Sequence, residues 1–532
     1  MKIRNWSLLI TLSALACFFY FYVTPSFLHP AEDAAVLFNY AQNFKQTGAI
    51  SYYIGGPHVD GNTDFLFMIL VSLFMHVFTD AYIAALAVSA LATMLTMFFI
   101  FKILDTKSLS LQYLALLLIF FSPQIWSSVL GFGTYFFAMI ISWVIFSFWK
   151  ENLQMLSITS FIAIMSRPEA IFVTIPLLWY ILHIRHRGTF LRKIRQIALY
   201  FILPLLLYGI FRIYYFGQLL PTVFNFGVDG TQKVLGSSHY NSFFNTKWYV
   251  LHVISPGLLG LFLYCLKEKF KIRNKYYILI FSTILLPLFV SLLTRLELDY
   301  TSRSFIISYI GLVITICLFI RNYKSITLSV FGIILLWFVG KNSIGNGVKS
   351  LNHFYNNTYN LSSELATLSN LKIATSEPGI LAWRSQKPTL DLWGINTPEL
   401  SKRIATQKDI DLWNPDLIYL HANPKNYISV PADSLKSAKT WNNMALQVIH
   451  LIKKEDYLVF TIPYDNRNYK EDRPSNMGLL KSLLKFISDS NEKISNRQDI
   501  IAINSNSKNR SQLLNMVEKY GAKLYVIPTG NP

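Results

Sequence analysis

The feature that most constrains this chain is a series of apolar runs between residues 6 and 339, many of them separated by short tracts rich in lysine and arginine. Of its 532 residues, 53% are hydrophobic and only 14% are charged, which is far from the composition of a soluble protein. An apolar helix of ~20 residues spans a bilayer. The sequence therefore predicts a polytopic α-helical membrane protein with about eleven spans, several of them short.

The basic tracts predict the orientation of these spans. The densest tract lies at 185–195 and another at 267–275, and such tracts usually face the cytoplasm. The run at 6–23 is interpreted as an uncleaved anchor whose basic N-terminal end is inside. The loop at 25–64 is then outside, and the short run at 65–79 is expected to form an interfacial helix.

The same tracts account for the formal net charge of +19, and no nucleic-acid-binding motif accompanies it. We therefore expect a lipid bilayer as partner and no nucleic acid. The three cysteines, Cys17, Cys265 and Cys317, all lie within apolar runs. Neither a disulfide framework nor a cysteine metal site is indicated.

Residues 341–532 differ in composition from the preceding transmembrane module at 1–340. They are rich in Asn, Ser, Lys and Asp, with β-rich runs at 373–376, 417–421, 457–462, 500–504 and 524–527, and helical patterns at 479–488 and 511–520. The sequence predicts a soluble α/β domain on the outer face. No glycine-rich loop opens a helix there, so nucleotide binding is not indicated.

The loop at 25–64 carries an unusual set of residues. Glu32 and Asp33 begin a predicted helix shortly after a proline, and Asp60 follows the Gly-Gly-Pro break at 55–57. Acidic residues in the first turn of a helix usually have only a structural role, because their negative charge stabilises the positive N-terminal end of the helix. Two roles for Glu32 and Asp33 therefore remain: stabilisation of the helix, and catalysis.

Charged residues near other outer span ends would face the same loop. They are Arg167, Glu169, Arg212, Asp299 and Arg303. Arg212 has no acidic neighbour at helical spacing, so it is our leading contact for a phosphate, whose oxygens match a planar guanidinium. The alternative is that Arg167 pairs with Glu169 and Arg303 with Asp299.

Several of these motifs resemble those of a known family. The loop motifs Glu32-Asp33-Ala34, Tyr40-Ala41-x-Asn43, Gly55-Gly56-Pro57 and Asp60-Gly61-x-Thr63 resemble the first outer loop of terminal arabinofuranosyltransferases and LphB-like proteins of the GT-C glycosyltransferase superfamily. Further resemblances lie at 166–170, 212–222, 298–305, 373–379 and 391–398. Together they extend over most of residues 1–400.

The resemblance implies an inverting transfer of a sugar from a polyprenyl-phosphate donor to an envelope glycan or glycolipid, such as lipopolysaccharide, on the periplasmic face of a bacterial inner (cytoplasmic) membrane. Asp33, or its neighbour Glu32, would be the base. The donor phosphate would be bound by Arg212, Arg303 and Arg167. The residues expected to contact substrates are Asp60, Thr63, Tyr40, Tyr215, Glu169, Asp299 and His58.

The carboxylates Glu32, Asp33 and Asp60 could also coordinate magnesium or calcium, but a phosphate held by arginines does not require a metal. We expect no obligatory metal or other cofactor. Gly133 stands where the family tends to carry glutamate, which leaves open a catalytically inactive glycolipid-binding protein. A lipid or glycan transporter or flippase is the remaining alternative, although such proteins usually place ionisable groups near the middle of the membrane.

These assignments predict the location of two reporters. A reporter fused at Gly188 should be cytoplasmic because it lies within the basic tract, and one fused after Pro532 should be outside. Reporter activity in intact cells measures both positions. A cytoplasmic reporter after Pro532 would contradict the convergence of the charged loops on one outer site.

Overall fold

The structure is a computed structural model. It describes residues 30–62, 64–105, 108–183, 189–222, 274–293, 300–323, 357–401, 405–421, 456–463 and 498–525, together with the single residues or short pieces 14, 17, 20–21, 254, 258–259, 261–262, 403, 448–449 and 452. Several predictions lie wholly or largely outside these residues: the spans at 6–23, 249–266 and 326–339, the helix at 479–488, Thr63 and Asp299.

Most of the described helices of the membrane module follow the predicted apolar runs to within a few residues, whereas the helices at Ile125–Val129 and Phe190–Ile197 have no such run. They are α3 (Phe65–Phe74), α4 (Ala81–Leu104), α5 (Leu109–Phe120), α6 (Ile125–Val129), α7 (Thr134–Trp149), α8 (Leu153–Ser166), α9 (Ile171–His183), α10 (Phe190–Ile197), α11 (Leu203–Phe216), α14 (Asn274–Ile280), α15 (Leu286–Leu293) and α16 (Ile306–Tyr323). Among the described residues, three helices are long and apolar enough to cross a membrane: Ala81–Leu104, Phe190–Phe216 and Arg303–Arg321. The span count and the orientation stay predictions.

α10 and α11 form one continuous helix through the π-helical segment η3 (Ala198–Ile202). Part of the basic tract at 185–195 therefore lies in the first turns of a helix. Lys193 is buried there, and its ammonium group donates to the carbonyls of Ile181 and Leu182 near the C-terminal end of α9, at 3.3 and 3.2 Å. A cation at this end of a helix stabilises it.

The C-terminal region contains a mixed six-stranded sheet with the order β2-β1-β3-β5-β4-β6. Its elements are α18 (Asn357–Leu365), β1 (Ile373–Thr375), α19 (Ile380–Ser385), β2 (Thr389–Asp391), α20 (Gln407–Trp413), β3 (Leu417–Leu420), β4 (Tyr457–Pro463), β5 (Gln498–Asn504), α23 (Arg510–Lys519) and β6 (Lys523–Leu524). β1 is parallel to β2 and β3, whereas β5 is antiparallel to β3 and β4. The sequence pattern does not predict β2, α18, α19 or α20.

Alternate strand residues enter two apolar cores, one on each face of the sheet. Ile373 and Leu417 share one core with residues of α18 and α23. Their neighbours Ala374 and Ile418 share the other core with a residue of α20. This two-sided burial explains why the strands are nearly continuous apolar runs. The domain boundary at residue 341 stays a prediction, because it lies outside the described residues.

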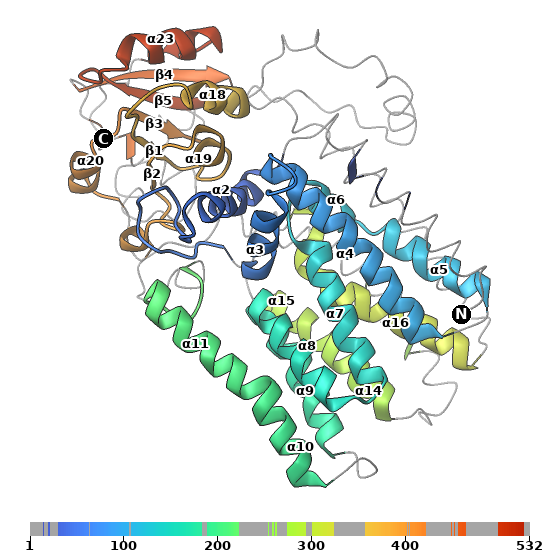
Figure 1. Cartoon of the computed structure of the whole chain (residues 1–532). Coiled ribbons are helices and arrows are strands. Elements are labelled where there is room, and N and C mark those ends of the chain that lie inside the picture. Colours follow the sequence, from blue (N-terminus) through green and yellow to red (C-terminus); the bar gives the residue numbers. More distant parts are fainter. Residues whose placement is uncertain are drawn as a thin grey trace.

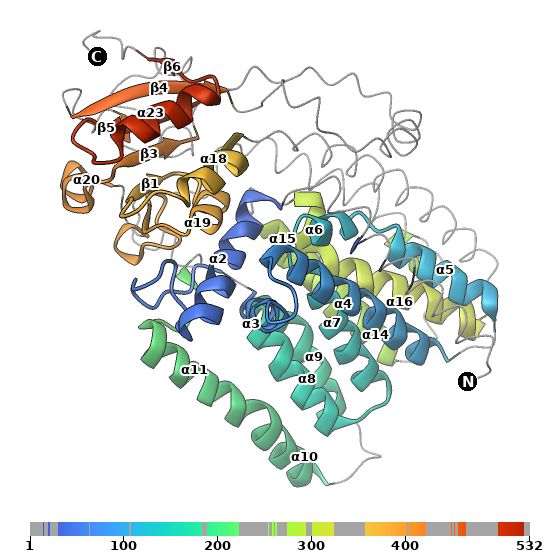
Figure 2. The same cartoon turned by 45° about the horizontal axis from the view of Figure 1, so that its top comes forward.

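α2 (Glu32–Thr47) and α3 lie between the sheet and the helical bundle, as two views show (Figure 1; Figure 2). α2 begins where the acidic pair predicts a helix, and it ends at Gly48, whose φ of 72° suits a glycine. The carboxyl ends of β1 and β2 lead into the loops that contact α2 and the residues after it. Within the predicted first outer loop at 25–64, the start of α2 therefore lies between the two regions, whereas Ile54 and His58 farther along the loop are exposed.

Buried hydrogen bonds join these loops to the first outer loop. The Tyr52 hydroxyl donates to the carbonyl of Pro378, and the Tyr40 hydroxyl donates to Oδ1 of Asn396 at 2.9 Å. Asn396 is held in turn by the buried Asp391, which accepts from its backbone N–H and its side-chain amide. Breaking one of these bonds would leave a buried polar atom unsatisfied. They therefore hold the sheet domain in one orientation on α2.

A methyl group at Gly379 should disturb this docking. A Cβ atom there would lie 1.8 Å from the carbonyl oxygen of Glu32, which is a backbone atom and cannot rotate away. We expect Gly379→Ala to insert into membranes but to be cleaved faster between the two regions, as limited proteolysis would measure. Gly209→Ala is the matched control, because its Cβ would lie 3.3 Å from a flexible leucine methyl group. Equal cleavage of Gly379→Ala and wild type would contradict the docking.

Candidate active site

Glu32 and Asp33 lie side by side in the first turn of α2 but have different partners. Oε1 of Glu32 accepts hydrogen bonds from the backbone N–H groups of Gly379 at 2.8 Å and Ile380 at 3.0 Å. Oδ2 of Asp33 lies 3.7 Å from Nη2 of Arg303, which is too far for a hydrogen bond, and its side chain is 38% exposed. Glu32 thus holds the sheet domain, whereas Asp33 faces an arginine.

Burial raises the pKa of both acids. The pKa of Glu32 rises from 4.5 to about 7, chiefly because burial removes water, while its two backbone hydrogen bonds act in the opposite sense. Burial also raises the pKa of Asp33, and the positive charge of Arg303 lowers it. A raised pKa makes a carboxylate a better proton acceptor near neutral pH.

A second set of charges lies beside α3 and α8. Oδ1 of Asp64 is 3.3 Å from Nε of Arg167, and the same nitrogen is 2.8 Å from Oε1 of Glu169. The Arg167–Glu169 pair offered as an alternative by the sequence is therefore present. Burial raises the pKa of Asp64, whereas the charges of Arg167 and Arg303 lower it, so Arg303 also acts on this carboxylate.

Arg303 connects the two sets. Its guanidinium lies over the ring of Phe132, with Cζ 3.9 Å from the ring centroid, and it faces Asp33 on one side. An arginine on an aromatic face is held by the ring and keeps its charge. We refer to five residues as the charge array: Asp33, Arg303, Asp64, Arg167 and Glu169.

Gly133 lies against the charge array. A Cβ atom at this position would be 2.8 Å from Cγ of Phe67 and 3.1 Å from Oδ2 of Asp64. The Gly133 backbone also hydrogen-bonds Asp64 and lowers the pKa of that carboxyl, against the rise from burial. The space for a larger residue is therefore occupied, and a carboxylate from Asp64 already lies beside it.

Arg212 has no acidic neighbour at helical spacing, as the sequence indicates, but it meets a carboxylate from a distant part of the chain. Its Nη1 lies 2.7 Å from Oδ2 of Asp60, and the guanidinium also donates through Nε to the Leu219 carbonyl and through Nη1 to the Tyr208 hydroxyl at 3.2 Å. Asp60 and Arg212 are both buried and lie 152 residues apart, so helical spacing could not reveal the pair. Within the structure, Arg212 connects α11 to the first outer loop.

The aromatic residues predicted to contact substrates separate into two groups. Tyr40 is buried, and its hydroxyl also accepts from the backbone N–H of Gly61 at 3.2 Å, so here it organises the loop and does not line an open site. Tyr215 stacks on the exposed His58, with 4.2 Å between ring centroids. The Tyr215 hydroxyl accepts from the N–H of Ile50 at 2.9 Å. His58 and Tyr215 thus form a fixed aromatic surface.

Sequence reasoning missed a titratable group on the sheet side of α2. His421 follows β3, and its Nδ1 lies 2.8 Å from Oδ1 of the buried Asp499 on β5. Its Nε2 lies 3.8 Å from Oε1 of Glu377. The charge of Asp499 contributes to the raised pKa of Glu32, so the group lies near the start of α2. A histidine at the end of the predicted strand 417–421 was the available signal, since Asp499 lies 78 residues away.

The three carboxylates considered as metal ligands do not converge. Glu32 accepts from backbone N–H groups, Asp60 pairs with one arginine, and Asp33 faces another. No group of three or more His, Cys, Asp or Glu side chains within the described part of the chain is arranged to hold a metal ion.

Comparisons with known proteins agree with the fold. A family model described as "Domain of unknown function (DUF8728)" matches residues 354–469, and no curated protein sequence matches the chain. Two solved structures of ArnT from Cupriavidus metallidurans are similar: the apo state, at 10% identity and a TM-score of 0.54, and the state bound to undecaprenyl phosphate, at 9% identity and 0.53. Each likeness covers 94% of this chain and 98% of the ArnT chain.

This likeness is evidence about the fold alone. Sequence identities of 9–10% do not show that the two proteins have the same activity. The chain therefore shares the overall fold of these ArnT structures, and three of its described helices are long and apolar enough to cross a membrane. The narrower likeness to terminal arabinofuranosyltransferases and LphB-like proteins is not shown by these neighbours.

The raised pKa of Glu32 predicts a pH-dependent stability. In the folded protein the Glu32 carboxyl has a pKa of about 7, against 4.5 for an ordinary glutamate. Between pH 4.5 and 7 the unfolded chain loses this proton while the folded protein keeps it, so the free energy of unfolding should fall over this range and level off above pH 7. Glu32→Gln should remove this part of the pH dependence, because the neutral amide still accepts hydrogen bonds. Thermal unfolding of the purified protein between pH 4.5 and 8 measures it. Glu518→Gln, at an exposed position on α23, is the control. Identical pH profiles for wild type and Glu32→Gln would contradict the assignment.

Proposed function

We propose that this protein is an integral-membrane glycosyltransferase that moves a sugar from a polyprenyl-phosphate donor to a glycan or glycolipid on the outer face of a bacterial inner membrane. The fold shared with the ArnT structures supports a membrane-embedded transferase. The charge array supports chemistry at the outer ends of the helices. A polyprenyl-phosphate donor is supported by the similar ArnT structure that holds undecaprenyl phosphate.

The availability of Asp33 carries this proposal. Glu32 is hydrogen-bonded to the sheet domain, and Asp60 and Asp64 are each paired with an arginine. Asp33 makes no hydrogen bond through its side chain with any described residue, and that side chain is 38% exposed. It is therefore the carboxylate of this loop that can take a proton from an incoming hydroxyl.

The proposed reaction is a single displacement. The acceptor oxygen attacks the anomeric carbon while its proton passes to the Asp33 carboxylate. The bond between the anomeric carbon and the phosphate oxygen breaks, polyprenyl phosphate leaves with the electron pair, and the anomeric configuration inverts. Arg303, 3.7 Å from Asp33, would neutralise charge that develops on the leaving phosphate.

The other residues take supporting roles in this proposal. Arg167, held by Asp64 and Glu169, adds positive charge next to the phosphate position. Tyr215 and His58 offer a stacked aromatic surface on which a sugar could pack. Arg212 is assigned to the loop through its ion pair, which revises its place as leading phosphate contact.

A second candidate keeps the fold but binds a glycolipid without chemistry. Gly133 favours it, because this position supplies no carboxylate. Asp64 lies against the same position, however, so a negative charge is present there. The response of surface glycans to an Asp33 variant separates the two candidates.

Asp33→Asn should strongly slow transfer while the protein still inserts and binds its donor. Asparagine preserves the volume of the side chain but cannot take the proton, so kcat should fall by roughly two to four orders of magnitude. Mass spectrometry of surface glycans from cells with wild-type protein, variant or no protein measures transfer. Binding of undecaprenyl phosphate to the purified proteins measures the donor site.

Glu32→Gln is the matched control in the same helical turn, because it keeps an acceptor for the N–H groups of the sheet domain. It should leave most of the transfer intact. Loss in Glu32→Gln with full transfer in Asp33→Asn would move the base by one residue. Surface glycans that do not depend on the protein at all would refute the glycosyltransferase.

A further inference from the structure

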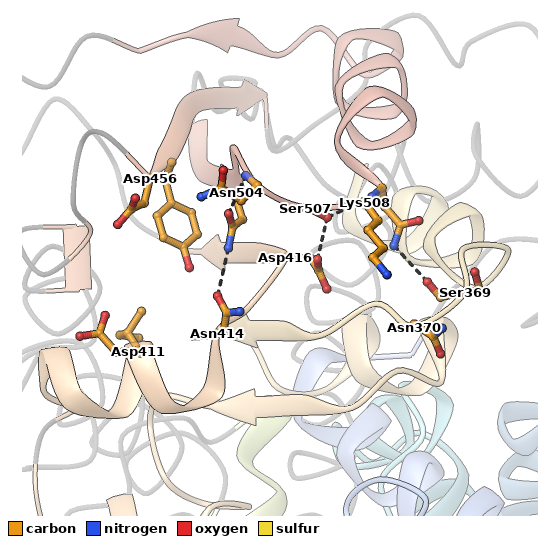
Figure 3. A pocket seen from close by; sticks show the side chains of 13 residues that line it. Ser369, Asn370, Asp411, Asn414, Asp416, Asp456, Asn504, Ser507 and Lys508 are labelled. Atoms are coloured by element: carbon orange, nitrogen blue, oxygen red, sulfur yellow. Dashed lines mark hydrogen bonds between the residues drawn. The ribbon is translucent and has the colours of Figure 1, made fainter.

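A cavity of about 500 Å³ opens in the sheet domain at the end of the sheet that faces away from α2. It is lined by residues that precede β1, by the C-terminal end of α20 and the turn after it, and by the adjoining ends of β4 and β5 with the loop that leads to α23 (Figure 3). Its volume is typical of small-molecule sites, which measure about 300–1,000 Å³.

The lining consists mainly of planar polar side chains. Of its 13 residues, five are asparagine, three aspartate and two serine, with one lysine, one tyrosine and one isoleucine. An apolar ligand would leave these polar groups without partners. Three carboxylates against a single ammonium group also disfavour a phosphate or a nucleotide. No described set of side chains is arranged for a metal ion.

Part of this lining forms a preorganised frame. Ser507 donates to Oδ1 of Asp416 at 2.6 Å, and Asn504 donates to Oδ1 of Asn414 at 3.2 Å, as the dashed lines in Figure 3 mark. Asn509 donates to a backbone carbonyl of the loop before β1 at 3.0 Å. These bonds connect three of the four stretches of chain that line the cavity: the residues before β1, the turn after α20, and the end of β5 with the loop after it.

Other lining groups remain available to a ligand. The side chains of Asn370, Asp456 and Lys508 make no hydrogen bond with any described residue. An amide both donates and accepts, a carboxylate accepts and an ammonium group donates. A ligand that satisfies all three must carry several groups that donate and accept along the cavity, because Figure 3 shows Asp456 at the opposite end from Asn370 and Lys508. The hydroxyl groups of a sugar, or of a short chain of sugars, have this property.

We propose that this cavity is a carbohydrate-binding site of the sheet domain. It holds one or more neutral or amino-bearing sugar units along a line of groups formed by the carboxylate of Asp456, the amides of Asn414 and Asn370, and the ammonium group of Lys508. The length of the strands, about 3.3 Å per residue, separates the cavity from α2. The site therefore binds sugar without contact with the charge array, and it does not depend on the proposed transfer reaction.

The test uses the full-length protein in detergent on an array of hexoses, hexosamines, pentoses and their short oligomers. We expect binding to at least one of these sugars, with displacement by the same sugar in solution and none by inorganic phosphate. The double variant Asn370→Gly/Lys508→Met should weaken binding by about tenfold, because two direct hydrogen bonds are lost. Glycine suits position 370, where φ is 52°.

Lys408→Met is the control, because Lys408 is exposed on α20 and lies outside the lining. Lys408→Met should bind the sugar as tightly as wild type. Asp33→Asn should also bind the sugar as tightly as wild type, and this result would show that the cavity is separate from the proposed active site. Binding to no sugar on the array would overturn the proposal. Unchanged binding in the double variant would overturn it as well, and displacement by phosphate would assign the cavity to anions.

Discussion

The loss of water where the sheet meets the helical bundle governs the candidate site. A carboxylate that loses its hydration needs hydrogen-bond donors or a positive partner, or it binds a proton. Glu32 has two backbone N–H groups, and Asp60 and Asp64 have arginines. Asp33 has only a distant arginine and partial exposure. Its proposed reactivity follows from the way its neighbours are satisfied.

The sheet domain takes part in this arrangement through contacts with α2. Gly379 lets the chain approach the Glu32 carbonyl more closely than any residue with a Cβ atom would allow, and the Glu32 carboxylate reaches the first N–H groups of α19. Tyr40 and Asn396 add a buried bond farther along the loop. The position of Asp33 therefore depends on residues that lie more than 340 positions later in the chain.

Local patterns in the sequence predict the elements but not their long-range pairs. Apolar runs predict α4 and α7 within a few residues, because burial in a helix or a bilayer demands such runs. The Arg167–Glu169 pair is predictable because its members are neighbours. Arg212 and Asp60 meet only through the packing of α11 on the first outer loop, so sequence spacing gives no sign of the pair. β2 is three residues long, too short for its own pattern.

The most direct test of the account is an experimental structure of the protein with a polyprenyl phosphate bound. We expect phosphate oxygens within hydrogen-bonding distance of the Arg303 guanidinium, with the Asp33 carboxylate on the side open to an acceptor. We also expect that Arg212 stays paired with Asp60. A phosphate bound at Arg212 with that pair broken, or one remote from Asp33, would contradict the central claim that the charge array is the site of transfer.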